Sequence, residues 1–133
     1  MKIKVSEASG AVLDWMVAKC EGYQAEGRVF LYGEPSKHVR IANQCGMEHT
    51  HHYSFEALFS TDWAQGGPII ERAGISLTQQ AHEPGLWWAS FCGALDFGQH
   101  NNAQYATTPL IAAMRCYVSS RLGDDVEVPD ELA

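Results

Sequence analysis

The stretch LWWASFC, residues 86–92, decides the fold that we expect for this chain of 133 residues. It has the length and the aromatic content of a β-strand. Consecutive strand residues point to opposite faces of a sheet, so Trp87 and Trp88 cannot share a side. Two indoles on opposite faces predict that both faces are covered, and helices on both sides would cover them. The alternative is that one indole lies exposed and marks a contact surface.

Two helices have clear ends in the sequence. The first is expected near residues 7–21, where the Ser6 hydroxyl can cap its start and Gly22 can end it. The last is expected near residues 108–122, because Thr108-Pro109 places a capping hydroxyl directly before a proline at the first helical position. The apolar face expected for this last helix holds Leu110, Ile111, Met114, Tyr117, Val118 and Leu122, with Arg115 and Ser119 on the opposite face.

A third helix is expected near residues 62–73, although it contains glycines and a proline. Asp62 as N-cap with Gln65 three residues later is typical of a capping box. Pro68 removes one helical hydrogen bond, so we expect either a kink or a second helix start at that point. The pair Gly66-Gly67 exposes bare backbone, which predicts a close approach by another element of the fold or by a ligand or partner.

The strands are less sharply marked than the helices. Residues 28–32 and 38–42 are typical of a hairpin, and a further strand starts at Ile75 after Gly74. Residues 43–60 and 93–107 are expected to be mainly loop. The sequence therefore predicts one α/β (α+β) domain over residues 1–133, an α-β-α sandwich whose small, mostly antiparallel sheet has helices packed on both faces.

Composition excludes several classes of function. Hydrophobic residues make up 46% of the chain and charged residues 19%, as in ordinary globular proteins. The net charge is −7, and residues 61–133 carry nine acidic but only three basic groups, so we expect no nucleic-acid binding. No apolar run approaches the ~20 residues that cross a bilayer, and the start lacks the pattern of a secretion signal. We therefore expect no membrane association and a location in the bacterial cytoplasm.

One histidine-rich segment could carry chemistry. Cys45, His49, His51 and His52 are residue types that bind zinc, which would suit a metal-dependent hydrolase. No second half-site accompanies them, so we interpret this segment as a solvated loop and expect no cofactor. Gly-x-Ser-x-Gly and P-loop motifs are missing as well, so the sequence favours a protein that is not an enzyme.

Binding is the remaining class of function. Large aromatic residues and arginine make good anchors at interfaces when they are partly exposed. The candidate ligand- or partner-binding residues are Trp63, Gln65, Gly66, Gly67, Trp88, Tyr105 and Arg115. An exposed aromatic face could also pair with itself in a homo-oligomer.

Three blocks of the chain resemble a known family: MKIKVSEASGAVLDWMVAKCEG at the start, STDWAQGGPIIERAGI in the middle and TPLIAAMRCYVSSRLGDDVEVPDEL at the end. They are similar to the NinX-like proteins of unknown function, small proteins encoded by tailed bacteriophages and prophages. The central block also resembles the phage α-β-α sandwich domain. This resemblance implies a phage accessory protein and supplies no catalytic residues. We therefore expect a non-enzymatic binding protein that acts on a host protein or a small molecule, with the hydrolase and a structural homo-oligomer as alternatives.

Overall fold

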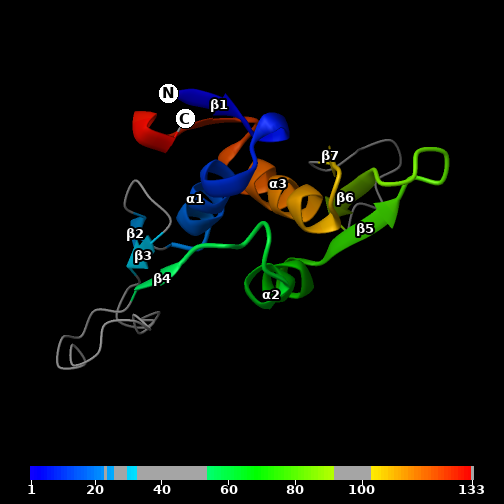
Figure 1. Ribbon diagram of the computed structural model, residues 1–133, viewed down its shortest axis with the longest axis horizontal. Helices are drawn as coiled ribbons and strands as arrows, with labels where there is room; N and C mark the ends of the chain where they lie inside the picture. Colours follow the sequence, from blue (N-terminus) through cyan, green and yellow to red (C-terminus); the bar gives the residue numbers. More distant parts are fainter. Residues whose placement is uncertain (23, 26–29, 33–53, 92–102, 133) are drawn as a thin grey trace.

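A helix at the centre of the molecule organises the fold. The computed structural model describes residues 1–22, 24–25, 30–32, 54–91 and 103–132. Within them, helix α3 (Pro109–Leu122) contacts both other helices, α1 (Gly10–Cys20) and α2 (Trp63–Ala73), and all three strands of one sheet. Figure 1 shows α3 in the middle of the molecule, with strands at three places around it.

The described strands form three small antiparallel sheets. The chain ends pair as β1 (Lys2–Lys4) and β8 (Asp125–Glu127). The second sheet has the order β2 (Gln24–Ala25), β3 (Phe30–Tyr32) and β4 (Ser54–Glu56). The third has the order β5 (Ile75–Gln79), β6 (Trp87–Phe91) and β7 (Gln104–Ala106). Two short 3₁₀ turns complete the fold, η1 (Val5–Glu7) and η3 (Asp130–Leu132).

The mixed α+β class with antiparallel strands is therefore confirmed. The strands are divided among three sheets in the described residues, where the sequence predicted one sheet. The predicted strand at LWWASFC is present as β6, at the centre of the third sheet. Strand pairing depends on contacts between distant parts of the chain, so local sequence patterns could not predict how the strands group into sheets.

The two indoles of β6 lie on opposite faces, as their alternation requires. Ala89 is fully buried in the core, and Trp87, on the same face of the strand, packs against that core. Trp88 points to the other face and stacks on Tyr105 of β7, with ring centroids 6.2 Å apart. Both indoles are half-buried, so each face shelters its tryptophan in part.

Helix α3 is buried on more than one side. Most of its residues are buried: Leu110, Ala112, Ala113, Met114, Cys116, Tyr117, Val118 and Ser119. The predicted single apolar face is wrong for Ser119, which is buried, and for Leu122, which is exposed. Ser119 is accommodated because its hydroxyl donates to Asp124 Oδ1 at 3.0 Å. α3 is buried on more than one side because α1 and the β5–β6–β7 sheet both contact it, and these tertiary contacts are not visible in the local pattern.

The first helix begins later than predicted. Ser6 lies in the 3₁₀ turn η1, and α1 starts at Gly10 with Ser9 as N-cap. The segment before α1 is held by tertiary contacts instead, because Val5 is buried and its N–H donates to the Asp124 carbonyl at 2.9 Å. The predicted end is confirmed, since Gly22 follows the last turn with a φ of 85°.

Helix α2 runs through Pro68 as one helix, without a second start. Asp62 is its N-cap, as predicted, and Gly74 ends it in the left-handed conformation. The capping box is incomplete, because Gln65 Oε1 accepts the Leu58 N–H at 2.8 Å. Ala64, whose carbonyl Pro68 cannot bond, is exposed, so water can satisfy that carbonyl.

Several predicted loops and strands turn out differently. Residues 43–60 contain β4, and residues 93–107 contain β7. Both strands are three residues long, which is too short for an alternating pattern to stand out. The second strand of the predicted hairpin, residues 38–42, lies outside the described residues. Its first strand is represented by β3, which pairs with β2 and β4.

The two ends of the chain are joined by the β1–β8 sheet (Figure 1). In its register, Lys2 lies opposite Glu127 and Lys4 opposite Asp125, so unlike charges face each other across the strands. The acidic C-terminal segment therefore contains a paired strand, β8.

Three helices also meet at a partly buried polar junction. Tyr117 of α3 donates its hydroxyl proton to Glu21 Oε2, which follows α1, and Arg72 of α2 donates to the same oxygen. Burial, reinforced by the hydrogen bond to Glu21, raises the pKa of Tyr117 to about 12. The junction ties the C-terminal parts of the three helices together.

Replacing the two helical glycines separately should have opposite effects on stability. A Cβ at position 66 would collide with the Phe59 carbonyl oxygen and lie 2.6 Å from Leu110 Cδ1, whereas at position 67 the nearest atom is 4.0 Å away. We expect Gly66→Ala to lower the free energy of unfolding by about 1–3 kcal/mol. Gly67→Ala should raise it by about 0.5–1 kcal/mol, since alanine favours the helix. Urea denaturation measures both, and an equal response of the two variants would contradict the close contact at Gly66.

The Tyr117 junction should be visible in alkaline solution. The folded-state pKa is raised above the ordinary value of 10.0 to about 12, so the stabilisation is complete below pH 10 and is lost as the pH rises toward 12. Tyr117→Phe removes this contribution, and its unfolding free energy should fall less steeply from pH 9.5 to 11.5. Burial also raises the pKa of the Cys20 and Cys116 thiols to about 12, but both remain in the variant. Urea denaturation at each pH measures the unfolding free energy. If it falls equally steeply with pH in the parent protein and in Tyr117→Phe, the assignment is refuted.

Candidate functional site

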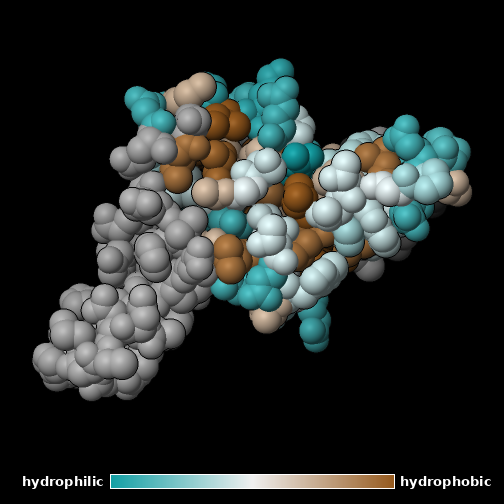
Figure 2. Space-filling model, in the orientation of Figure 1, coloured by the Kyte–Doolittle hydropathy of each residue, from teal (hydrophilic) through white to brown (hydrophobic). Residues whose placement is uncertain are grey.

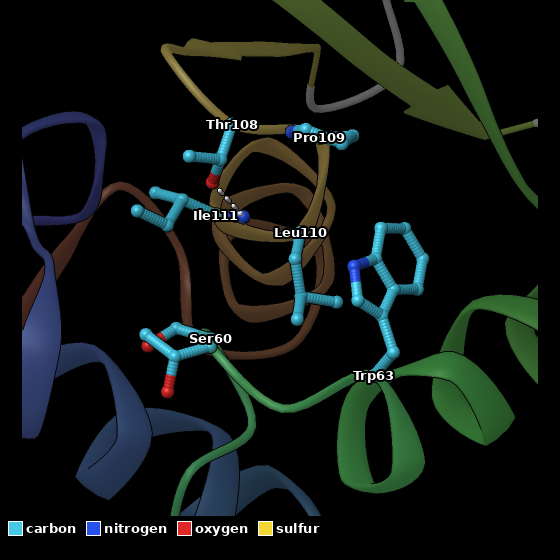
Figure 3. Close-up of a pocket in the computed structure, with 7 residues that line it drawn as sticks. Ser60, Trp63, Thr108, Pro109, Leu110 and Ile111 are labelled. Carbon is cyan, nitrogen blue, oxygen red and sulfur yellow. Dashed lines mark hydrogen bonds between the residues drawn. The ribbon is translucent and has the colours of Figure 1, made fainter.

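A cleft lies where α2 and α3 begin. Its volume is about 230 Å³, and one wall comes from the segment before α2 and the other from the first turn of α3. The lining consists of Ser60, Thr61, Trp63, Thr108, Pro109, Leu110 and Ile111. Figure 3 shows Ser60 and Trp63 on either side of Leu110, with Pro109 at the start of α3 beyond.

Local sequence fixes both walls of the cleft. Asp62 Oδ1 accepts the Ala64 N–H at 2.9 Å and starts α2 next to Trp63. Thr108 Oγ1 accepts the Ile111 N–H at 3.2 Å and starts α3, with Pro109 in its first turn (Figure 3). Because a capping residue holds the first turn of each helix, Trp63 and Leu110 are presented from ordered backbone.

The wall that precedes α2 is anchored to α1. Ser60 is 1% exposed, and its N–H donates to Asp14 Oδ1 at 2.8 Å. Asp14 is itself buried within α1. A hydrogen bond to a buried carboxylate is stronger than one between neutral groups, so this contact holds the segment before α2 against the core.

Trp63 is the most prominent residue of the cleft. Its exposed fraction is 52%, which is unusual for so large an apolar side chain. Its indole stands beside Leu110 and Pro109 in Figure 3, and Figure 2 shows apolar surface in the middle of the molecule, between α2 and α3. None of the seven lining residues is ionisable. The described residues of the cleft can therefore offer apolar contact and hydroxyl hydrogen bonds, and none of them has a side chain that exchanges a proton near pH 7.

The other candidate residues of α2 support Trp63 from inside the fold. Gly66 is buried against Leu110 and the Phe59 carbonyl, so the close approach predicted at the glycine pair comes from the fold itself. Gly67 is half-buried and lies beside the Trp63 ring. Gln65 holds the preceding loop through Leu58.

The remaining candidates form a second group around β7. Trp88 and Tyr105 stack on each other, and Tyr105 is 51% exposed. Arg115 donates through Nε to the Ala8 carbonyl at 2.7 Å and through Nη1 to the Tyr105 carbonyl at 2.8 Å. Partial burial lowers the pKa of the Arg115 guanidinium. Arg115 thus connects α3 to two segments of backbone, which is a structural role.

The histidine-rich segment lies outside the described residues, and with it Cys45, His49, His51 and His52. In the part of the chain that the structure describes, no three metal-binding side chains gather in one place. Over the same residues, the helices are all too short or too polar to cross a bilayer.

Six of the seven lining residues were missed as site candidates, among them Thr108, Pro109 and Leu110. The sequence marked the first two as a helix start and Leu110 as core. Ser60 and Thr61 carried no signal beyond their position before the helix cap. What joins them is the contact between α2 and α3, which local pattern cannot reveal.

These features define a small α+β protein whose described surface includes one uncharged cleft with a projecting tryptophan. Residues 4–121 match the family model described as Bacteriophage P22, NinX. The chain belongs to this phage family, and the resemblance seen in three blocks of its sequence extends over most of its length. Membership supports a phage accessory protein as its general role. A search of curated proteins finds no match.

The structural role of Arg115 can be tested by a conservative replacement. Lysine keeps the positive charge but cannot reproduce both hydrogen bonds of the guanidinium fork. We expect Arg115→Lys to lower the free energy of unfolding by about 1–2 kcal/mol. The control is Arg121→Lys, because Arg121 is exposed, and it should stay within about 0.5 kcal/mol of the parent protein. If both variants unfold at the same urea concentration as the parent, the two hydrogen bonds of Arg115 contribute nothing.

Proposed function

We propose that this phage protein is a non-enzymatic binding protein of the bacterial cytoplasm, which captures a host protein or a small molecule through the Trp63 cleft. The observation that carries the proposal is a half-exposed tryptophan beside a cleft of about 230 Å³. Tryptophan is enriched among the residues that dominate binding energy at interfaces.

The lining supports binding over catalysis. General acid–base and nucleophilic mechanisms need ionisable or activated groups within hydrogen-bond reach of the substrate. The cleft is lined by apolar and hydroxyl side chains, which suit recognition of an apolar group. A partner docked there would cover the indole that is now in contact with solvent.

Site-specific photo-crosslinking in bacterial cells tests this function. A photoreactive phenylalanine derivative replaces Trp63, and in a control protein it replaces Glu71, which is exposed on the same helix. We expect a discrete crosslinked species from position 63 and none from position 71. A thermal-shift screen of host metabolites covers the small-molecule case.

The control also sets the outcome that would end the proposal. If position 63 gives no product beyond that of position 71, and no metabolite raises the melting temperature of the parent protein more than that of Trp63→Ala, the cleft is not a binding site.

A further inference from the structure

We infer that the occupant of the Trp63 cleft is one large apolar side chain, carried by a positively charged polypeptide segment. This inference rests on the proposed function and narrows it from a host protein or small molecule to a peptide-like partner of stated charge. Three observations support it: the volume of the cleft, its uncharged lining, and the negative charge of Asp62 beside it and of the chain as a whole.

The volume favours a side chain over a whole small molecule. Pockets that bury most of a drug-sized ligand or cofactor measure about 300–1,000 Å³. The cleft, at about 230 Å³, falls below this range. A single leucine, methionine or phenylalanine side chain is the kind of group that it can hold, with the rest of the partner lying across its mouth.

The lining favours a partner that places an uncharged side chain inside the cleft and its polar backbone at the rim. Leu110 is buried and Ile111 and Pro109 are half-buried, so the inner surface is apolar. A charged group placed there would lose its hydration without gaining a partner. Thr61 and Thr108 are exposed, and each hydroxyl keeps a proton that it can donate to a peptide group of a bound segment.

The charge around the cleft favours a basic partner. Asp62 lies between two lining residues, Thr61 and Trp63, and it is partly exposed. Residues 61–133 hold nine acidic and three basic groups. The three basic groups are all arginines, and two of them make internal contacts. Arg72 contacts Glu21, and Arg115 contacts two backbone carbonyls. Asp62 at the cleft and the net charge of −7 of the whole chain both attract lysine and arginine, which speeds encounter with a basic segment.

The same charge disfavours a second copy of this chain as the occupant. Each copy carries a net charge of −7, so two copies brought face to face repel each other. A dimer would have to overcome this repulsion with apolar contact around Trp63 alone.

Synthetic peptides with blocked ends test the inference by calorimetric titration of the full-length protein. The first peptide has one phenylalanine flanked by lysines, the second replaces the lysines by glutamates, and the third replaces the phenylalanine by alanine. We expect the first to bind at least about tenfold more tightly than either of the others at low salt. Its advantage over the glutamate peptide should shrink in 0.5 M salt, because salt screens the charges.

Two variants and a control assign the effect to residues. Trp63→Ala should weaken the lysine–phenylalanine peptide at least about tenfold. Asp62→Asn should weaken it about threefold by removing one charge, while asparagine keeps the helix cap. Tyr105→Ala, which removes the other exposed aromatic ring among the described residues, should leave the affinity unchanged. Circular dichroism shows whether each variant is folded.

Each other occupant has its own signature, and each overturns the inference. Equal binding of the lysine and glutamate peptides, or of the phenylalanine and alanine peptides, refutes the basic apolar anchor. If sedimentation velocity shows a dimer of the parent protein and Trp63→Ala is monomeric, the cleft is occupied by a second copy. Free indole binding as tightly as the lysine–phenylalanine peptide assigns it to a small molecule. The proposed function fails separately, only if crosslinking at position 63 and the metabolite screen are both negative.

Discussion

Burial of α3 on several sides is the constraint on which the rest of the structure depends. The helix contacts α1, α2 and the β5–β6–β7 sheet, and small residues such as Ala112, Ala113 and Cys116 let these neighbours approach its axis closely. The polar residues that α3 carries must then find partners within the fold. Ser119 is satisfied by Asp124 and Arg115 by two carbonyls, so the chain segments that supply these partners are fixed by the same helix.

The cleft follows from how α2 meets α3. Gly66 lets the backbone of α2 touch Leu110 without an intervening side chain, and this contact brings the first turns of the two helices together. Trp63 lies one turn before Gly66, and its half-exposed indole stands beside the start of α3 (Figure 3). The glycine that appears unsuitable for a helix is therefore what places the binding candidate. An interaction surface positioned by ordered helix ends loses little conformational freedom on binding.

The predicted site residues fall into two groups, one exposed at the cleft and the other in contact with the rest of the fold. Trp63 was chosen as a large aromatic residue, and in the folded chain it is half-exposed beside the cleft. Gln65, Gly66 and Arg115 were chosen for their chemistry, yet in the folded chain they hold backbone or allow close packing. A polar side chain can make the same type of hydrogen bond to its own backbone or to a ligand. The sequence alone does not say which of the two it will bind.

By itself the sequence determined the helix ends at Asp62, Gly74 and Thr108, and the placement of Trp87 and Trp88 on opposite faces. These features depend on residues within a few positions of each other, where capping and alternation act. Only the tertiary structure decided that the strands form three sheets, that α1 starts at Gly10, that α3 is buried on several sides, and that Ser60 and Thr108 share a cleft. Each of these depends on contacts between residues far apart in the chain, whose energies no local pattern records.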